Sequence, residues 1–419
     1  MIGKDLLKTI IVDNQHSVIP EVWERNLQIP TNSGHIITLI GVRRSGKTFH
    51  LFNLINQLKK DGVPNENILY FNFEDERLHL SSKDLDLILQ AYQELYPNLK
   101  FADCYFFFDE VQEVEGWEQF VSRIYASISQ HLFITGSNSK LLSQEIATAL
   151  RGRTITFEVY PFSFTEYVRV LSPGLNSFSS PDRAYLVNLF ERFMHQGGFP
   201  KLIKQADDLR EKILQEYFNV MIFQDLIERF KLSGNAALKY FCKRVIGASA
   251  GEFSVNKIYN ELKSQGYQVS KDTLYLYQGY VEAIYLNRFL NKFSHSVVKV
   301  ESSQKKTYVI DQGFGAALDF KLSLDKGRLL ETTVALELLK LGKQVSYIQN
   351  GSECDFVVIE NGNVTNAIQV VYDFTDLKTK HREVRGLVQS CLKFNLTEGT
   401  ILTFDYTEEL KQEGVKIHV

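Results

Sequence analysis

Residues 41–48 read GVRRSGKT, and this complete G-x-x-x-x-G-K-[ST] phosphate loop constrains the chain more than any other feature. The apolar run Ile36–Ile40 before it predicts a buried strand, and residues 49–58 after it carry apolar side chains at helical spacing. A strand, a glycine loop and a helix in this order form the usual context of a phosphate-binding loop. A chance glycine-rich turn is the alternative, and both flanking elements argue against it.

The residue types of the loop suit a triphosphate and its metal ion. Gly41 and Gly46 let backbone N–H groups turn inward, and the helix that begins near Lys47 directs further N–H groups to the same anion. Lys47 is predicted to reach the β- and γ-phosphates, and the Thr48 hydroxyl to bind Mg²⁺. The predicted nucleotide-binding residues of the loop are Gly41, Val42, Arg43, Arg44, Ser45, Gly46, Lys47 and Thr48. The two arginines of this set can equally face solvent.

An acidic pair follows the apolar run 104–108, where a second motif of a nucleotide site is expected. A buried strand would deliver Asp109 to the Mg²⁺ shell, and Glu110 is placed to polarise the attacking water. Alone, such a pair would indicate a solvated strand end. Downstream of a phosphate loop it predicts a metal ligand and a catalytic base, so the two motifs together predict nucleoside-triphosphate hydrolysis. ATP is the expected nucleotide because no N-K-x-D motif for guanine stands out.

Composition narrows the class of protein. Of 419 residues, 44% are hydrophobic and 23% are charged, as in soluble globular proteins of two or three domains. The net charge of −3 argues against a surface built throughout for nucleic acid. The four cysteines lie far apart without a CxxC pair, which predicts reduced thiols. No apolar run approaches the ~20 residues that span a bilayer, and the first residues do not form a signal peptide, so a cytoplasmic protein with no membrane partner is expected.

The first half of the chain alternates apolar strand runs with helical segments, which predicts an α/β fold with a parallel sheet covered on both faces. The carboxyl ends of such strands form the edge where ligands bind, and Gly41, Asp109 and Asn138 all follow predicted strands. The predicted strands are Ile36–Ile40, Ile68–Phe73, Cys104–Phe108, Leu132–Thr135 and Thr154–Val159.

Residues from about 25 to 202 resemble the AAA+ ATPase module, in particular a prokaryotic group whose loop reads G-x-R-R-x-G-K-T. The resemblance implies that Asn138 is the sensor 1 residue, which orients the attacking water. It also implies that Gly197–Pro200 opens a lid helix, and that Lys201 takes the sensor 2 position, where many relatives carry arginine. Lys201 is therefore a further expected nucleotide-binding residue.

The same resemblance implies an arginine finger before the fifth strand. Such a residue stabilises charge on the γ-phosphate of a neighbouring subunit, so a homo-oligomeric ring is also implied. Arg153 is the favoured candidate, and Arg151 remains open. The alternative is that both arginines face solvent near a helix end, where the helix dipole favours cations.

The middle of the chain changes character. Two short helices at 253–262 and 270–277, a turn between them and a strand at 283–286 are typical of a winged helix-turn-helix. Residues 253–306 hold eight Lys and Arg against four Asp and Glu, a local net charge of +4 that suits a DNA face. The second helix offers only Lys271 to a base, however, so packing or oligomer contacts are favoured over DNA readout.

The last third of the chain predicts an α-β-β-β-α-β order. It resembles the core of the PD-(D/E)xK nucleases, which implies metal-ligand positions for Glu331, Asp355 and Gln369. The nuclease pattern places a lysine two residues after the last of these, where this chain has Val371. An apolar side chain cannot activate water, so an inactive nuclease with structural polar groups is expected.

The whole arrangement resembles a prokaryotic AAA+ ATPase family with a C-terminal domain of unknown function. The expected order is a P-loop AAA+ parallel-sheet ATPase domain with the start of its lid at 1–205, a helical and winged-helix domain at 206–300, and an α/β restriction-endonuclease-like domain at 301–419. The predicted function is Mg²⁺-dependent ATP binding and hydrolysis that drives work on DNA or a protein partner through residues 253–306. The alternatives are a slow nucleotide-gated switch or DNA-binding regulator and, third, an ATP-dependent nuclease.

Overall fold

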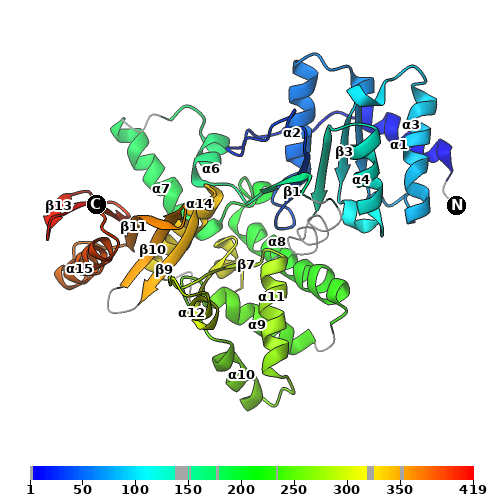
Figure 1. The fold of residues 1–419 in the computed structure, drawn as a ribbon. Coiled ribbons are helices and arrows are strands. Elements are labelled where there is room, and N and C mark those ends of the chain that lie inside the picture. Colours follow the sequence, from blue (N-terminus) through cyan, green and yellow to red (C-terminus); the bar gives the residue numbers. More distant parts are fainter. Residues whose placement is uncertain are drawn as a thin grey trace. The chain divides into compact units, whose positions relative to one another are not determined.

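The computed structural model describes residues 3–136, 150, 152–175, 179–232, 235–318, 325–349 and 353–419. Contacts divide the chain into two compact units, residues 1–162 and residues 163–419. Figure 1 follows the chain through both units from blue to red. The three predicted domains divide the chain more finely, after residues 205 and 300, and those two boundaries stay predictions.

The first unit is built on a sheet with the strand order β2-β3-β4-β1-β5. Its neighbouring strands pair in parallel, as expected, because helices carry the chain back between them. All five residues of β1 are buried, which suits a strand covered on both faces. The strands are β1 (Ile36–Ile40), β2 (Ile68–Asn72), β3 (Tyr105–Asp109), β4 (Leu132–Gly136) and β5 (Thr154–Glu158).

Helices cover both faces of this sheet. Side chains alternate between the two faces along a strand, and Ile37 and Leu39 of β1 form one core with Leu51 of α2. On the opposite face, the ring of Phe108 on β3 packs against the ring of Phe120 on α4. The helices of this unit are α1 (Lys4–His16), α2 (Lys47–Lys60), α3 (Leu85–Leu95) and α4 (Trp117–Ser127).

Helices also open the second unit. They are α6 (Phe164–Leu171), α7 (Ser180–Gln196), α8 (Asp207–Val220), a π-helical continuation (Met221–Glu228) and α9 (Asn235–Gly247). Among the helices that the structure describes, none is both long and apolar enough to cross a membrane.

A three-stranded antiparallel sheet with the order β6-β8-β7 follows α9. The two helices and the strand predicted after them are present, with two differences, and the winged helix-turn-helix stays a prediction. Phe253 belongs to a strand rather than to the first short helix, and the strand after the second helix begins at Asn287. The predicted strand start at Ala283 is wrong because Val281 and Ala283 are still buried in the helix. The elements are β6 (Gly251–Phe253), α10 (Val255–Ser264), α11 (Lys271–Ala283), β7 (Asn287–Leu290), α12 (Val297–Ser302) and β8 (Lys305–Val309).

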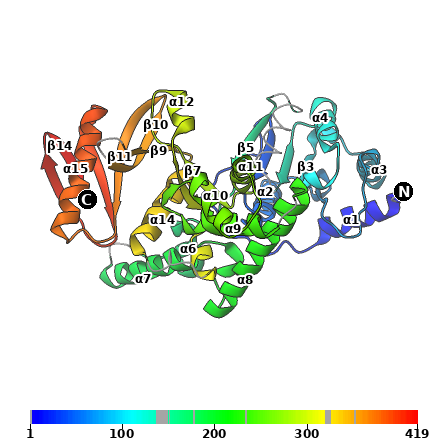
Figure 2. The same cartoon turned by 90° about the horizontal axis from the view of Figure 1, so that it is seen from below.

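The C-terminal part holds a six-stranded mixed sheet with the order β13-β14-β12-β11-β10-β9. β12 pairs in parallel with β11 and β14, and the other pairs are antiparallel. The predicted α-β-β-β-α-β order is present, and a hairpin of β13 and β14 extends it. Figure 2 shows α15 against this sheet, where it contacts β10, β11 and β12. The elements are α13 (Gly313–Ala317), α14 (Lys326–Lys340), β9 (Gln344–Gln349), β10 (Glu353–Glu360), β11 (Asn363–Val371), α15 (Leu377–Lys393), β12 (Glu398–Thr403), β13 (Glu409–Gln412) and β14 (Val415–His418).

A buried carboxylate joins distant segments of the second unit. Asp311, two residues after β8, accepts hydrogen bonds from the backbone N–H groups of Gly198 at 2.7 Å and Gly313 at 2.9 Å. Gly197 has φ +77°, and a Cβ there would lie 1.8 Å from Asp311 Oδ1. The segment after α7 is therefore held by Asp311 and requires glycine at this position.

The pKa of Asp311 predicts a pH-dependent stability. Burial raises this pKa to about 6, although the N–H groups of Gly198 and Gly313 oppose the rise, and the value lies above the ~3.9 of an unfolded chain. The folded state therefore holds the proton more tightly, so the stabilisation by this carboxyl is complete below pH ~4 and falls as the pH rises through 6. We expect Asp311→Ala to lower the free energy of unfolding at both pH values. This loss should be about 1 kcal/mol smaller at pH 7.5 than at pH 5.

Urea unfolding of both proteins at the two pH values measures this difference. Asp208→Ala, which changes an exposed aspartate of α8, is the matched control. A loss of stability in Asp311→Ala that grows with pH would contradict the assignment.

Candidate functional site

The loop between β1 and α2 can form because two of its positions are glycine. Gly41 has φ +152°, and a Cβ at this position would lie 2.2 Å from the carbonyl oxygen of Val159. Gly46 has φ +102° and ψ 23°, a left-handed conformation, and α2 begins directly after it at Lys47. Arg44 (φ +69°) is a further left-handed residue in the same turn. Such a backbone can direct successive N–H groups to one concave side.

Lys47 is folded into this loop. Its side chain is only 4% exposed, and its ammonium donates to the carbonyl oxygens of Gly41 at 3.2 Å and Val42 at 3.4 Å. The same nitrogen lies 3.7 Å from Glu110 Oε1. The lysine predicted to hold phosphate and the glutamate predicted to activate water therefore lie side by side.

β3 ends on Asp109, whose carboxylate is almost fully buried. Its Oδ2 accepts a hydrogen bond from Tyr70 on β2 at 2.9 Å, and its Oδ1 accepts one from the hydroxyl of Thr135 on β4. Thr48, in the first turn of α2, hydrogen-bonds to the same carboxylate. Burial and then the charge of Glu110 raise the pKa of Asp109, and the three hydroxyl groups oppose the rise. The two predicted metal-binding residues are therefore in contact.

Glu110 has an unusual backbone conformation, with φ +52° and ψ 48°. Its N–H donates to the Thr135 hydroxyl at 2.9 Å, and its Oε2 accepts a hydrogen bond from Gln112 at 2.6 Å. A left-handed conformation at a residue with a side chain costs about 1 kcal/mol or more and persists where neighbours hold it. The Thr135 hydroxyl links the two acidic residues, since it donates to Asp109 and accepts from Glu110.

Several supporting residues of the site do not stand out in the sequence. Tyr70 and Thr135 lie beside Asp109 because β2 and β4 flank β3. Their one signal in the sequence is a polar group inside an apolar strand run. Arg25, well before β1, donates to the carbonyl oxygens of Ser45 at 3.1 Å and Tyr160 at 2.7 Å, and so ties the loop to the segment after β5.

Three predicted site residues are not among the described residues of the first unit. Asn138 and Arg151 lie outside the described residues. Lys201 is an exposed residue of a short 3-10 helix (Pro200–Leu202) in the second unit. The roles predicted for these residues stay predictions.

Two of the predicted arginines, Arg153 and Arg43, contact other side chains of the first unit. The guanidinium of Arg153 lies 5.5 Å from the ring centroid of Tyr125. The guanidinium of Arg43 lies 3.5 Å from the carboxylate of Glu74. Burial and then Glu110 raise the pKa of Glu74, while Arg43 lowers it. Both arginines can therefore be held by the chain itself, and their predicted contacts with nucleotide or neighbour stay predictions.

The site in the first unit offers what a nucleotide and Mg²⁺ require. The hydroxyl of Ser45 is buried in the loop and has no hydrogen-bond partner in the part of the chain that the structure describes. The Thr48 hydroxyl and the Asp109 carboxylate supply oxygen atoms, the donors that Mg²⁺ prefers. Lys47 supplies an ammonium whose carbonyl partners can be exchanged for phosphate oxygens. The residues present therefore fit both groups.

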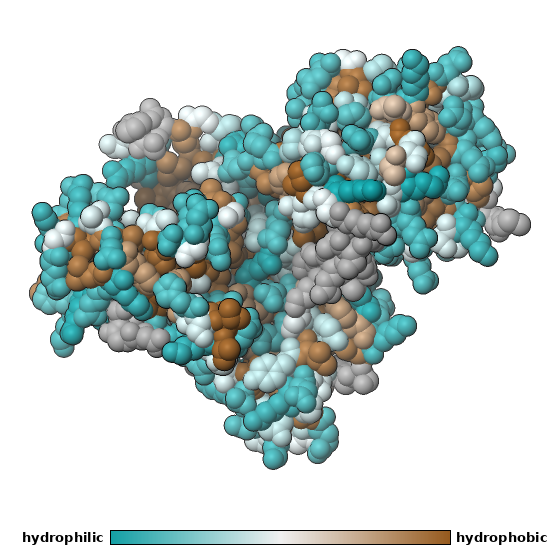
Figure 3. All heavy atoms as spheres, in the orientation of Figure 1, coloured by the Kyte–Doolittle hydropathy of each residue, from teal (hydrophilic) through white to brown (hydrophobic). Residues whose placement is uncertain are grey.

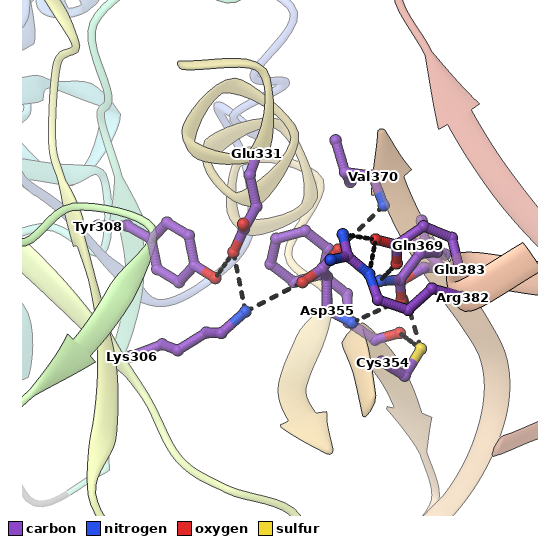
Figure 4. A network of polar contacts seen from close by, with 11 residues as sticks. Lys306, Tyr308, Glu331, Cys354, Asp355, Gln369, Val370, Arg382 and Glu383 are labelled. Carbon is purple, nitrogen blue, oxygen red and sulfur yellow. Dashed lines mark hydrogen bonds and ion pairs between the residues drawn. The ribbon is translucent and has the colours of Figure 1, made fainter. Parts of the chain in front are cut away.

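A second polar cluster occupies the C-terminal part, at the positions implied by the resemblance to nucleases (Figure 4). Glu331 on α14, Asp355 on β10 and Gln369 on β11 do come together. Position 371, where the nuclease pattern has a lysine, is a valine in this chain, and Val371 packs in the apolar core of the sheet. Among the described residues, no group of three His, Cys, Asp or Glu side chains is arranged to hold a metal ion. The cluster does not fit the metal that a nuclease would need.

Comparison with known proteins finds two domain matches and two long relatives. A model described as an AAA domain matches residues 33–168, and one described as a domain of unknown function (DUF8612) matches residues 187–326. An uncharacterized protein of Methanocaldococcus jannaschii is 33% identical over 419 residues, 98% of this chain and 91% of that protein. An uncharacterized protein of Haemophilus influenzae is 28% identical over 384 residues, 91% of this chain and 92% of that protein.

Two solved structures are similar at low sequence identity. The Walker-type ATPase of Pyrococcus abyssi has a TM-score of 0.43 at 18% identity, and the match covers 68% of this chain and 90% of that one. Cdc6p of Pyrobaculum aerophilum has a TM-score of 0.27 at 13% identity, with 73% and 90% covered. At these TM-scores neither structure carries a further argument.

The AAA domain match spans the phosphate loop, Asp109 and Glu110, in agreement with the parallel sheet. Neither domain match extends beyond residue 326, so nothing in the comparisons supports a nuclease. The match to the archaeal relative runs over almost the whole of both chains at 33% identity. The chain therefore belongs to the family of the uncharacterized Methanocaldococcus jannaschii protein, and its first unit is a P-loop domain of the AAA type.

Proposed function

We propose that this protein binds ATP together with Mg²⁺ in its first unit and hydrolyses the ATP. The proposal rests on the meeting of Lys47, Asp109 and Glu110 at the carboxyl edge of the parallel sheet. Open α/β sheets bind their ligands at this edge. The match to an AAA domain supports the same assignment.

The loop would hold the phosphates with its backbone N–H groups, the N-terminus of α2 and the ammonium of Lys47. This ammonium now donates to the carbonyl oxygens of Gly41 and Val42. Phosphate oxygens carry charge and are stronger acceptors than carbonyl groups, so the exchange is favourable. The same exchange would move the ammonium away from Glu110 and leave that carboxylate to accept a proton from the attacking water.

Thr48 and Asp109 would hold Mg²⁺, which neutralises charge on the β- and γ-phosphate oxygens when it is bound. Asp109 must be ionised to act as a ligand, and burial, which raises its pKa, opposes ionisation. Tyr70 and Thr135 donate hydrogen bonds to its two oxygens and so favour the ionised form. These hydroxyl groups are the positioning residues of the metal ligand.

A groove beside α2 is the candidate place for the nucleotide base. It is lined by residues of the segment before β1, including Arg25 and Ile29, and by α2 residues such as Asn53 and Gln57. Arg25 also contacts the carbonyl group of Ser45, so the groove adjoins the phosphate loop. The lining is mainly polar, and its amide groups can form hydrogen bonds with the edges of a base. ATP is the nucleotide of choice because a guanine motif does not stand out in the sequence.

A homo-oligomer is part of the proposal, with Arg153 as the residue that reaches the nucleotide of a neighbouring chain. In the single chain its guanidinium lies over the ring of Tyr125. Such a contact is worth about 0.5–1 kcal/mol at a partly exposed position, and a γ-phosphate would be a stronger partner. Arg151 remains the alternative finger.

A nucleotide-gated switch that acts on a protein is the second candidate function. α11 is the helix that a winged helix-turn-helix presents to DNA, yet it exposes Tyr275 and Leu276 by 54% and 57%. Lys271, the one cation of this helix, lies 5.3 Å from the ring centroid of Tyr259. Val297 of α12 is 76% exposed, and Figure 3 shows hydrophobic side chains at the surface there. Exposed apolar side chains favour a protein partner over DNA.

Lys47→Ala should abolish ATP hydrolysis. The substitution removes a buried ammonium that would stabilise charge on the phosphates, and the loss of one such donor lowers kcat by about 100-fold to 1000-fold. Steady-state ATP hydrolysis by the purified protein measures the effect. Lys83→Ala changes an exposed lysine of the same unit and should hydrolyse ATP at the parent rate. Hydrolysis at the parent rate by Lys47→Ala would contradict the proposal.

Glu110→Gln should separate binding from chemistry. The amide keeps the shape of the side chain but cannot take a proton, and the loss of a general base lowers kcat by about 100-fold or more. The affinity for ATP should change little. Single-turnover hydrolysis and equilibrium binding of a fluorescent ATP analogue measure the two effects, with Glu115→Gln, an exposed glutamate nearby, as control. Equal rates for Glu110→Gln and the wild type would exclude Glu110 as the base.

The same assay with duplex DNA separates the two candidate functions. Turnover that rises with DNA in the wild type and stays low in Glu110→Gln supports work on DNA. Turnover that ignores DNA at every salt concentration supports the switch with a protein partner, because contacts with DNA phosphates would depend on salt.

Thr135→Val should loosen the link between the two acidic residues. Valine keeps the shape of threonine but not its hydroxyl, so the Glu110 N–H and an Asp109 oxygen lose a buried partner. The free energy of unfolding should fall by about 1–3 kcal/mol, and ATP hydrolysis should fall with it. Thr135→Ser keeps the hydroxyl and should retain most of both. Chemical unfolding and ATP hydrolysis measure the effects, and equal behaviour of the Val and Ser variants would show that the link is dispensable.

A further inference from the structure

Lys306 lies at the centre of the polar cluster in the second unit, between acidic side chains from two other elements (Figure 4). Its ammonium is 3.0 Å from Glu331 Oε1 on α14 and 3.0 Å from Asp355 Oδ1 on β10. The side chains of Lys306, Glu331 and Asp355 are 12%, 14% and 11% exposed. A single internal cation therefore bridges two largely buried carboxylates.

The remaining hydrogen bonds of the cluster are directed at protein groups. Tyr308 donates to Glu331 Oε1 at 2.8 Å, and the N–H of Val370 donates to Asp355 Oδ2 at 3.0 Å. Gln369 accepts the N–H of Asp355 at 3.1 Å through its oxygen and donates to a carboxylate of α15 through its nitrogen. A metal ion between the two carboxylates would have to displace the ammonium of Lys306, and Mg²⁺ in particular requires a nearly ideal octahedron of oxygen atoms.

The charges favour an ammonium that stays in place. Burial lowers the pKa of Lys306, but the charges and the hydrogen bonds of Asp355 and Glu331 together raise it by more, so the net shift is upward and the ammonium stays charged at neutral pH. Burial and then Asp355 raise the pKa of Glu331, although Lys306 opposes the rise. Without Lys306, the two carboxyl groups would need a proton or a cation from solution to offset their charge.

We infer that Lys306 is the resident cation of this cluster and that it keeps divalent cations out. The ammonium already bridges Glu331 and Asp355, the two carboxylates between which a metal ion would bind, at hydrogen-bond distance from each. The cluster is thus a closed ion-pair site, in agreement with the apolar Val371 beside it in the sheet. Removal of the ammonium converts it into a site for a divalent cation.

The bridge also joins two sheets of the second unit. Lys306 belongs to β8, the central strand of the three-stranded sheet, whereas Asp355 belongs to β10 of the six-stranded sheet. Main-chain hydrogen bonds connect the same two regions. The N–H of Phe293 donates to the carbonyl oxygen of Tyr347 at 2.8 Å. The N–H of Tyr347 donates to the carbonyl oxygen of Asn291 at 3.2 Å. Lys306 therefore fixes the winged-helix region to the C-terminal sheet as well as balancing its charge.

Binding of Mn²⁺ to the full-length protein, counted by electron paramagnetic resonance without nucleotide, tests this inference. Every protein in the comparison carries Asp109→Asn, which weakens the metal site of the first unit. We expect Lys306→Met to bind one more Mn²⁺ per chain than this parent, because a like charge has left the site. The affinity of the cluster for Mn²⁺ should be at least about tenfold higher in Lys306→Met than in the parent. The additional ion should disappear when Asp355→Asn is added.

Further variants keep the result decisive if Lys306→Met folds poorly. Lys306→Arg keeps a cation and should bind no more Mn²⁺ than the parent. A Lys306→Met protein that unfolds alone should regain its fold in Mn²⁺, since an ion that binds only the folded state stabilises it. The double variant with Asp355→Asn has less unbalanced charge and should fold without the metal.

Three results would overturn the inference. The first is Mn²⁺ binding by the parent that depends on Asp355. The second is a Lys306→Met protein that gains neither bound Mn²⁺ nor stability from Mn²⁺. The third is cleavage of plasmid DNA by the parent with Mn²⁺ that Asp355→Asn abolishes, because it would make Lys306 part of an active nuclease.

Discussion

The close approach of the backbone at Gly41 to the segment after β5 is the constraint on which the first unit depends. No side chain fits there, because a Cβ would lie 2.2 Å from the carbonyl oxygen of Val159. A loop that leaves the sheet at this point must turn at once, and the left-handed Gly46 ends the turn by starting α2. Thr48, in the first turn of that helix, then reaches Asp109 at the end of β3. The contact between Thr48 and Asp109 therefore depends on the absence of a side chain at Gly41.

Local features of this unit follow from the sequence because each depends on residues only a few positions away. The motif GVRRSGKT, between an apolar run and an amphipathic segment, predicts β1, the loop and α2 together. The run 104–108 predicts β3 to within one residue, since a strand buried on both faces is a continuous apolar run. The structure has it as Tyr105–Asp109, so the acidic residue completes the strand. All four cysteines are buried and free, and their reduced state stays a prediction.

Contacts between distant segments do not follow from the sequence. Tyr70 and Thr135 reach Asp109 only because of the strand order, which is a property of the whole sheet. The spacing of the nuclease motif predicts a lysine at position 371, near Glu331 and Asp355. The ammonium that contacts these two acids comes instead from Lys306 on another strand. The strand predicted at 283–286 failed for a different reason, since a short apolar run fits helix and strand equally well.

The lysine–carboxylate contacts of Lys47 and Lys306 differ in physical character. Lys47 lies 3.7 Å from Glu110 and otherwise donates to two carbonyl oxygens, so no short ion pair with another described residue holds it. Lys306 lies 3.0 Å from each of two buried carboxylates. An ammonium held by neutral groups can be captured by an incoming anion, whereas one between two buried acids leaves only if another cation or a proton replaces its charge. The same side chain is therefore suited to exchange its partners in the first unit and to remain fixed in the second.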